Sequence, residues 1–235
     1  MRDKDVIIAC DFKDKETFLN FLNLFPKEQK PFVKIGMELF YSEGPDIVKI
    51  VRERNHDVFL DLKLHDIPNT VMSAMRNIAK LDVQITNIHS STTEMLKAAL
   101  EGLQVDNPSK TLLIAVTQLT STSKESLKNE LLIDYSMEEV VKLYAKRAYE
   151  AGLAGVVCSP LETKPIKETC GDSFITVTPG IRYPNANVSD DQARVTTPKE
   201  AGNLGCDYIV VGRPITRADN PQEAYMKVKK DFLGE

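Results

Sequence analysis

Short apolar runs rich in β-branched residues alternate along the chain with longer amphipathic stretches. A run of about five apolar residues predicts a buried strand, and apolar residues three or four positions apart predict a helix with one packed face. Eight runs predict strands, at residues 6–11, 32–36, 58–62, 84–89, 111–117, 155–159, 174–178 and 208–212. Helical spacing appears at residues 15–25, 45–55, 69–81, 93–103, 138–151 and 221–232.

Regular alternation of strands and helices implies that the strands are parallel. Eight such units in 235 residues come close to the ~250 residues typical of a (β/α)8 TIM barrel. An open, doubly wound sheet is the main alternative, and it also buries both faces of its strands. The number of units favours the barrel. Because no linker or low-complexity stretch interrupts the pattern, we predict one α/β domain over residues 1–235.

Composition excludes several classes of function. The chain is 42% hydrophobic and 27% charged with a formal charge of -4, so it has no general basic field for nucleic acid or an anionic membrane. No apolar run approaches the ~20 residues of a membrane helix, and the charged start does not resemble a signal peptide. The four cysteines are far apart, which is typical of reduced thiols. We expect a cytoplasmic protein without nucleic-acid or membrane partners.

Charged residues stand where the predicted strands end, which is where a barrel places its catalytic groups. Asp11 ends the first strand, Lys34 lies inside the second, and Asp61 and Lys63 lie two positions apart on the third. The two-residue period of a strand directs Asp61 and Lys63 to one face. Since burying each ion costs several kcal/mol unless it is paired, we predict a chain of alternating charges. The plain alternative is a structural ion pair at the barrel rim.

Two further segments indicate a site for an anion. Residues 178–182 read Thr-Pro-Gly-Ile-Arg after the seventh strand, and Gly212 and Arg213 follow the eighth. Barrels often bind phosphate at these two loops, where glycine lets backbone N–H groups approach and arginine adds paired contacts. A turn glycine before a solvated arginine is the alternative.

The histidines suggest no chemistry by themselves. We expect His56 to be solvated in a polar turn, and His89 either to line the barrel mouth or to cap a turn. His65 receives no role.

Residues 61–70, Asp-Leu-Lys-Leu-His-Asp-Ile-Pro-Asn-Thr, resemble the D-x-K-x-x-D-I-P-x-T signature of the orotidine 5'-phosphate decarboxylase family. Residues 32–36, 115–121, 178–182 and 210–216 also resemble segments of this family, in the same order. The resemblance covers nearly the whole chain and is closest to the short bacterial branch. It implies a TIM-barrel carboxy-lyase that converts orotidine 5'-monophosphate to uridine 5'-monophosphate in pyrimidine synthesis, with no cofactor and no metal.

The resemblance also implies roles for particular residues. Lys34, Asp61, Lys63 and Asp66 would form the catalytic network, with Asp66 supplied by the partner subunit of a homodimer. Asp11 and Lys34 would hold ribose hydroxyls, Thr120 and its neighbours the pyrimidine, and Arg182, Gln192, Gly212 and Arg213 the phosphate. Other implied substrate contacts are Asp61, Ile67, Pro68, Asn69, Thr70 and Pro179.

The expected chemistry requires stabilisation of a negative charge. Loss of carbon dioxide from C6 of the orotate ring leaves an electron pair in an sp2 orbital, and the chain shows no pyridoxal, thiamine or zinc signature. Lys63 is the predicted cation and proton donor, and Asp61 its orienting partner. Two alternatives stay open: a magnesium-dependent sugar-phosphate decarboxylase or aldolase with a similar Asp-x-Lys strand, and an inactive barrel that senses nucleotide phosphates.

Overall fold

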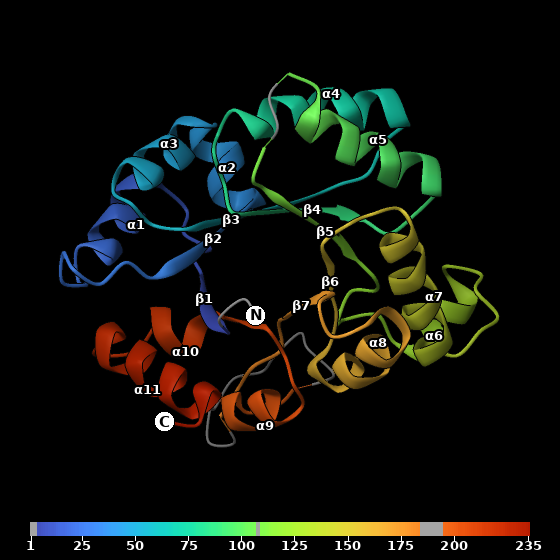
Figure 1. Ribbon diagram of the computed structural model, residues 1–235. Helices are drawn as coiled ribbons and strands as arrows, with labels where there is room; N and C mark the ends of the chain where they lie inside the picture. Colours follow the sequence, from blue (N-terminus) through green and yellow to red (C-terminus); the bar gives the residue numbers. More distant parts are fainter. Residues whose placement is uncertain (1–3, 107–108, 184–194) are drawn as a thin grey trace.

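The computed structural model describes residues 4–106, 109–183 and 195–235. Within these ranges eight parallel strands close into a barrel in sequence order, with β8 paired to β1 (Figure 1). The strands are β1 (Asp5–Ala9), β2 (Phe32–Gly36), β3 (Val58–Leu64), β4 (Ile85–His89), β5 (Leu112–Val116), β6 (Gly155–Val157), β7 (Ile175–Thr178) and β8 (Tyr208–Val211). The predicted (β/α)8 barrel is therefore confirmed, and the open sheet is excluded.

Helices surround the barrel on its outside (Figure 1). They are α1 (Lys15–Leu22), α2 (Met37–Glu43), α3 (Asp46–Glu53), α4 (Pro68–Ala79), α5 (Thr93–Gln104), α6 (Lys124–Asn129), α7 (Met137–Glu150), the 3-10 turn η1 (Pro160–Glu162), α8 (Thr163–Cys170), α9 (Pro198–Asn203), α10 (Arg213–Thr216) and α11 (Pro221–Leu233). The six predicted helices are confirmed, with ends shifted by at most three residues.

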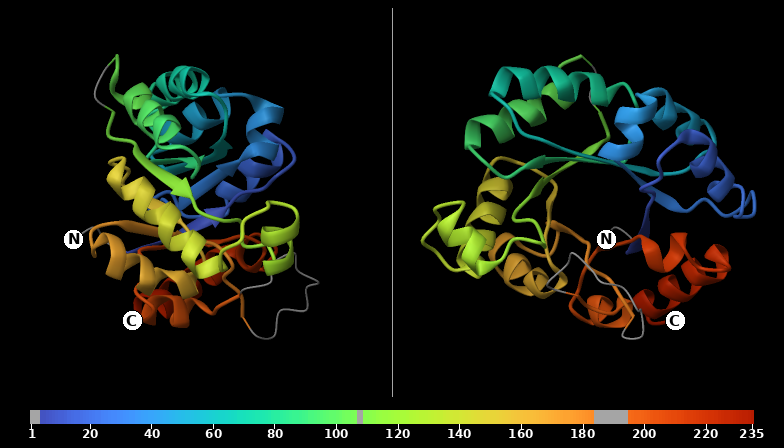
Figure 2. Two further views of the ribbon diagram at one scale, coloured as in Figure 1. Left: turned by 90° about the vertical axis from the view of Figure 1, so that its right-hand side faces the viewer. Right: turned by 180° about the vertical axis from the view of Figure 1, so that it is seen from behind.

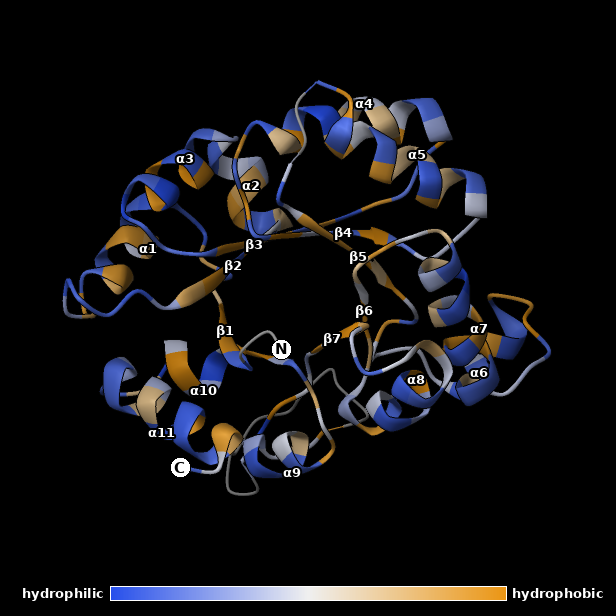
Figure 3. Ribbon diagram, in the orientation of Figure 1, coloured by the Kyte–Doolittle hydropathy of each residue, from blue (hydrophilic) through white to orange (hydrophobic). Residues whose placement is uncertain are grey.

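Helix α7 shows how the sequence determines these elements. Ser136 accepts a hydrogen bond from the backbone N–H of Glu139, and the Glu139 carboxylate accepts one from the backbone N–H of Ser136, which closes a capping box. Val141 and Ala148 are buried on the packed face of the helix. In Figure 3 the strands are mostly hydrophobic, while the helices carry hydrophilic residues toward the outside.

The strands are buried on both faces, as a parallel barrel requires. Ile8 and Leu60 pack outward against the helices, and their neighbours Ile7 and Phe59 pack into the barrel interior. Ile114 joins that interior layer from the opposite side. The filled interior closes the barrel below its mouth, and barrels of this kind bind their ligands in the loops at the carboxyl ends of the strands.

Strand β3 departs from regular pairing where the signature begins. Leu60 pairs with Thr86 of β4, but the next paired residues are Leu64 and Ile88. Three residues of β3, 61–63, therefore lie opposite one residue of β4, and Lys63 has a positive φ of 50°. A bulge of this kind redirects side chains and is common beside active sites.

One expectation was wrong. His56 is only 4% exposed, and its Nδ1 lies 3.0 Å from the carbonyl oxygen of Pro31. The chain that leads into β2 covers this turn, and a backbone partner satisfies the ring where solvent was expected. In the described ranges no helix is long and apolar enough to cross a membrane.

Candidate active site

A cavity of about 570 Å³ opens at the carboxyl ends of the strands. A volume of this size suits a small organic ligand. Phe59 and Val210 contribute apolar surface to it, and residues 118–121 after β5 form part of its wall. The left view of Figure 2 shows α6, which follows this wall, at the end of the barrel toward which the strand arrows point.

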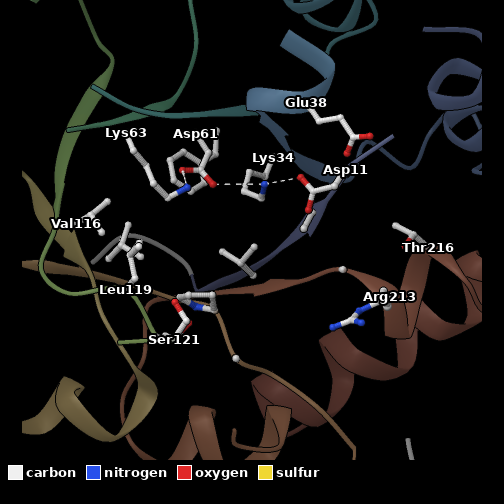
Figure 4. Close-up of a pocket in the computed structure, with 18 of the residues that line it drawn as sticks. Asp11, Lys34, Glu38, Asp61, Lys63, Val116, Leu119, Ser121, Arg213 and Thr216 are labelled. Carbon is white, nitrogen blue, oxygen red and sulfur yellow. Dashed lines mark hydrogen bonds and ion pairs between the residues drawn. The ribbon is translucent and has the colours of Figure 1, made fainter. Parts of the chain in front are cut away.

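Four charged side chains form a continuous row along one wall of the cavity (Figure 4). The Lys34 ammonium lies 2.8 Å from Oδ1 of Asp11 and 3.4 Å from Oδ2 of Asp61. The Lys63 ammonium lies 2.6 Å from Oδ1 of Asp61. The predicted chain of alternating charges is confirmed as a geometric arrangement. Lys34 lies in β2 and Asp61 and Lys63 lie in β3, whereas Asp11, predicted to end the first strand, stands two residues beyond the end of β1.

The two inner groups of this row, Lys34 and Asp61, are deeply buried and stay ionised. Burial acts to raise the pKa of Asp61, but the ammonium groups of Lys34 and Lys63 and hydrogen bonds from Lys63 and Asn87 hold that pKa below its usual value. Burial acts to lower the pKa of Lys34, and the carboxylates of Asp61 and Asp11 raise it above its usual value instead. The site therefore holds fixed charges that need little rearrangement when a reaction develops charge.

Gly36 makes room for the outer ion pair. A Cβ atom at this position would lie 2.9 Å from Oδ1 of Asp11 and 3.0 Å from Nζ of Lys34. Contacts this short would displace one of the two groups. The sequence reading included Gly36 in a family-like segment but assigned it no role.

The residues predicted to hold an anion lie on the opposite side of the cavity. Pro179, Arg182, Gly212 and Arg213 all line the cavity, from the ends of β7 and β8. Figure 4 shows Arg213 well separated from Lys63 across the cavity. An elongated ligand with an anionic end can therefore contact arginine at that end and the charged row at its other end.

The predicted substrate contact Thr120 also lines the cavity. The second half of the signature does not. Asp66, Ile67, Pro68, Asn69 and Thr70 are exposed in the single chain and lie outside the cavity wall, and Asp66 accepts a hydrogen bond from the backbone N–H of Ile67. Ile67 is 67% exposed, which is unusual for isoleucine beside a site. The predicted phosphate contact Gln192 lies outside the described residues.

Three polar or charged cavity residues received no role in the sequence analysis: Glu38, Thr216 and Arg217. Glu38 stands two positions after the end of β2, and the other two stand at the end of α10, one turn after Arg213. Their spacing after a strand end was the available signal, but the short helices α2 and α10 that present them were not predicted.

His65 and His89 lie side by side next to the charged row, with ring centroids 5.7 Å apart. Burial, followed by the charges of His65 and Lys63, lowers the pKa of His89. His89 is absent from the cavity wall, so it does not line the mouth directly. Among the described residues no group of three or more His, Cys, Asp or Glu is arranged to hold a metal ion.

Residues 4–228 match the sequence profile of the orotidine 5'-phosphate decarboxylase / HUMPS family. The chain belongs to this family. It is 53% identical to the orotidine 5'-phosphate decarboxylase of Bacillus cytotoxicus over 235 residues, which cover 98% of each protein. It is 54% identical to that of Staphylococcus aureus over 228 residues, 97% of each.

A solved structure agrees with this assignment. The crystal structure of orotidine 5'-phosphate decarboxylase from Lactobacillus acidophilus superposes with a TM-score of 0.88 at 42% identity, and the match covers 98% of this chain and 100% of that one. The match therefore covers the whole barrel and not only the short sequence motifs.

Proposed function

We propose that the chain is an orotidine 5'-phosphate decarboxylase, a carboxy-lyase that converts orotidine 5'-monophosphate to uridine 5'-monophosphate and carbon dioxide in de novo pyrimidine biosynthesis. The observation that carries the proposal is the row from Asp11 to Lys63, which lies across the cavity from Arg213. Relatives with this name over nearly the full length of the chain support it. Residues 1–235 would act as a single catalytic domain.

The substrate would bind with its phosphate toward Arg182, Gly212 and Arg213 and its ring toward Lys63. Asp11 and Lys34 would hold the ribose hydroxyls between these ends, and Thr120 and Pro179 would contact the ring. Contacts at the phosphate, remote from the reacting carbon, can provide binding energy that excludes water and orients the ring. Ile67, Pro68, Asn69 and Thr70 would complete the site from a neighbouring subunit.

The chemical step needs only groups of this chain. The bond between C6 and the carboxylate breaks, the electron pair stays on C6, and carbon dioxide leaves. The Lys63 ammonium stabilises that charge and donates its proton to C6, after which the amine regains a proton from solvent. Asp61 keeps Lys63 charged and oriented at 2.6 Å, and its own charge would repel the carboxylate that is lost.

A homodimer fits the exposed end of the signature. Asp66 and Ile67 are exposed in the single chain, immediately after the strand that carries Asp61 and Lys63. An exposed apolar side chain beside a cavity is typical of a surface that a second subunit covers. Asp66 would then join the partner's charged row and make a shared network of four charged residues with Lys34, Asp61 and Lys63.

A cytoplasmic location is consistent with the cysteines. Cys10, Cys158, Cys170 and Cys206 all lie in the described ranges, and all four are buried and free of disulfides. Buried free thiols persist in a reducing compartment.

The direct test mixes the purified chain with orotidine 5'-monophosphate in excess EDTA. Loss of orotate absorbance is followed together with the appearance of uridine 5'-monophosphate by chromatography. We expect turnover to the monophosphate product. Activity that appears only after magnesium is added would support a metal-dependent relative, and binding without product would support a sensor; either result contradicts the proposal.

A further inference from the structure

Asn87 lies on β4 directly opposite the bulge of β3, and its side chain is fully buried. It does not line the cavity and would not touch a bound substrate. It is nevertheless the residue of β4 that faces residues 61–63, since its neighbours Thr86 and Ile88 pair with Leu60 and Leu64.

The carboxamide of Asn87 makes two hydrogen bonds to the charged row. Its Oδ1 accepts from the backbone N–H of Lys63 at 2.8 Å, and its Nδ2 donates to Oδ1 of Asp61 at 2.6 Å. The backbone N–H can only donate and an ionised carboxylate can only accept, so these partners define which end of the amide is which. A carboxamide fits this position because it offers an acceptor to the Lys63 N–H and a donor to the Asp61 carboxylate at the same time.

The bulge explains why the hydrogen bond from the Lys63 N–H to Asn87 is needed. Lys63 has a φ of 50°, which is uncommon for a residue with a long side chain, and regular pairing with β4 is interrupted around it. The side chain of Asn87 therefore provides the acceptor that a regular ladder would take from the β4 backbone. It holds Lys63 in the conformation that brings its ammonium to the same oxygen, Oδ1 of Asp61, that Asn87 also contacts.

We propose that Asn87 is a positioning residue for the decarboxylation: it holds the β3 bulge and Oδ1 of Asp61 together, and thereby aims the Lys63 ammonium at the reacting carbon. The inference rests on the proposed function and deepens it. Removal of this support should lower kcat and leave substrate affinity nearly unchanged, since the ligand contacts stay intact.

Asn87→Asp separates this role from simple packing because the two side chains have the same shape. In its ionised form the introduced carboxyl group would accept from the Lys63 N–H but would face the Asp61 carboxylate as a second anion. In its protonated form it would donate to Asp61 and restore both bonds. The charged groups at this position are Lys34 of β2 and Asp61 and Lys63 of β3. The titratable pair His65 and His89 lies next to the same row in the wild type and in every variant, so the ratio of each variant to wild type removes its contribution. The neighbouring strand β5 carries no titratable side chain.

The experiment measures kcat and KM between about pH 5 and pH 9 for the full-length wild-type chain and three variants, because the protonation of an added carboxyl falls in or near this range. The variants are Asn87→Asp, Asn87→Ser and the control Thr86→Val. Thr86 is equally buried on the same strand and donates to the carbonyl oxygen of Leu60, so its loss tests general weakening of β4.

We expect Asn87→Asp to lose about 100-fold in kcat at pH 8 and to recover at least tenfold, relative to wild type, at pH 5, with KM within about threefold. Asn87→Ser should lose kcat to the same extent at every pH. Thr86→Val should melt at a lower temperature and keep its kcat.

An Asn87→Asp variant that stays folded and shows a pH-independent ratio to wild type would overturn the inference. So would an Asn87→Ser variant with wild-type kcat, and this second variant decides the matter if the buried carboxyl prevents folding. An inactive wild-type chain has a different meaning, because it overturns the proposed function and removes the basis of the inference with it.

Discussion

The Lys63 ammonium lies 2.6 Å from Asp61 although the backbone between them leaves regular strand geometry, with a φ of 50° at Lys63. Both side chains still reach one face of β3, and Lys34 contacts the other oxygen of the same carboxylate at 3.4 Å. One buried anion thus organises two cations, and the charge of Asp61 determines the electrostatics of the site.

The stability of the chain should therefore depend on pH through this carboxylate. The pKa of Asp61 lies below its usual 3.8 in the folded chain, so the ionised network stabilises the fold above that pH and loses this effect as pH falls through the lowered pKa. The pKa of Lys34 lies above 10.5, so its contribution is complete below that pH and is lost as pH rises through the raised pKa.

We expect urea unfolding to show the loss of this stabilisation at low pH. The difference in free energy of unfolding between wild type and Asp61→Asn should be constant from about pH 5 to pH 9 and should shrink below about pH 4. A difference that stays constant through the acid range would mean that Asp61 keeps the same protonation in both states.

Gly36→Ala tests the outer ion pair. The added methyl must displace Asp11 or Lys34, so we expect about a tenfold rise in KM with the barrel still folded. In an Asp11→Ala background the same change should have a smaller further effect, since the nearer of the two crowded groups is gone and the Lys34 ammonium can move into the space that it leaves. Additive effects of the two substitutions would mean that Gly36 does not act through the ion pair between Asp11 and Lys34.

The anion site should contribute to the rate as well as to binding. We predict that Arg213→Ala lowers kcat/KM by roughly 100-fold and that kcat falls while KM rises. The reason is that binding energy at the phosphate is used to orient the ring of the substrate at Lys63. Lys164→Ala removes an exposed cation outside the cavity and serves as the control. An Arg213→Ala enzyme that only raises KM would show that the phosphate contact serves affinity alone.

A shared site predicts complementation between two inactive chains. Asp66→Ala and Asp61→Ala should each be nearly inactive, and their mixture after subunit exchange should recover up to about a quarter of wild-type activity, since half the dimers are mixed and each has one intact site. Recovery of the untagged variant together with an affinity-tagged copy of the other variant confirms that exchange took place. No recovery in a mixed dimer would mean that each barrel is self-contained.

The barrel could be predicted because its signals are local and repeated. Apolar runs identify the short strands, and helical spacing identifies helices of at least eight residues, whereas α2, α6, α9 and α10 span seven residues or fewer, too few for a period to appear. In α8 the proline at residue 165 interrupts the helical pattern, although it stands in the first turn, where proline is tolerated.

The charged row could also be predicted, but not its geometry. The two-residue period placed Asp61 and Lys63 on one face, while the bulge that sets their contact depends on the pairing of β3 with β4. No sequence pattern indicates a role for Asn87, because a single asparagine in an apolar strand has no local signal. Its partners come from residues more than twenty positions away.

The most direct test of the account is the turnover of orotidine 5'-monophosphate by wild type and by Lys63→Ala in excess EDTA, with folding of both chains checked by circular dichroism. Wild type should form uridine 5'-monophosphate, and the folded Lys63→Ala chain should form none above background, because the group that stabilises and protonates C6 is gone. A folded Lys63→Ala chain that retains more than about a tenth of the wild-type rate would contradict the central role of this lysine.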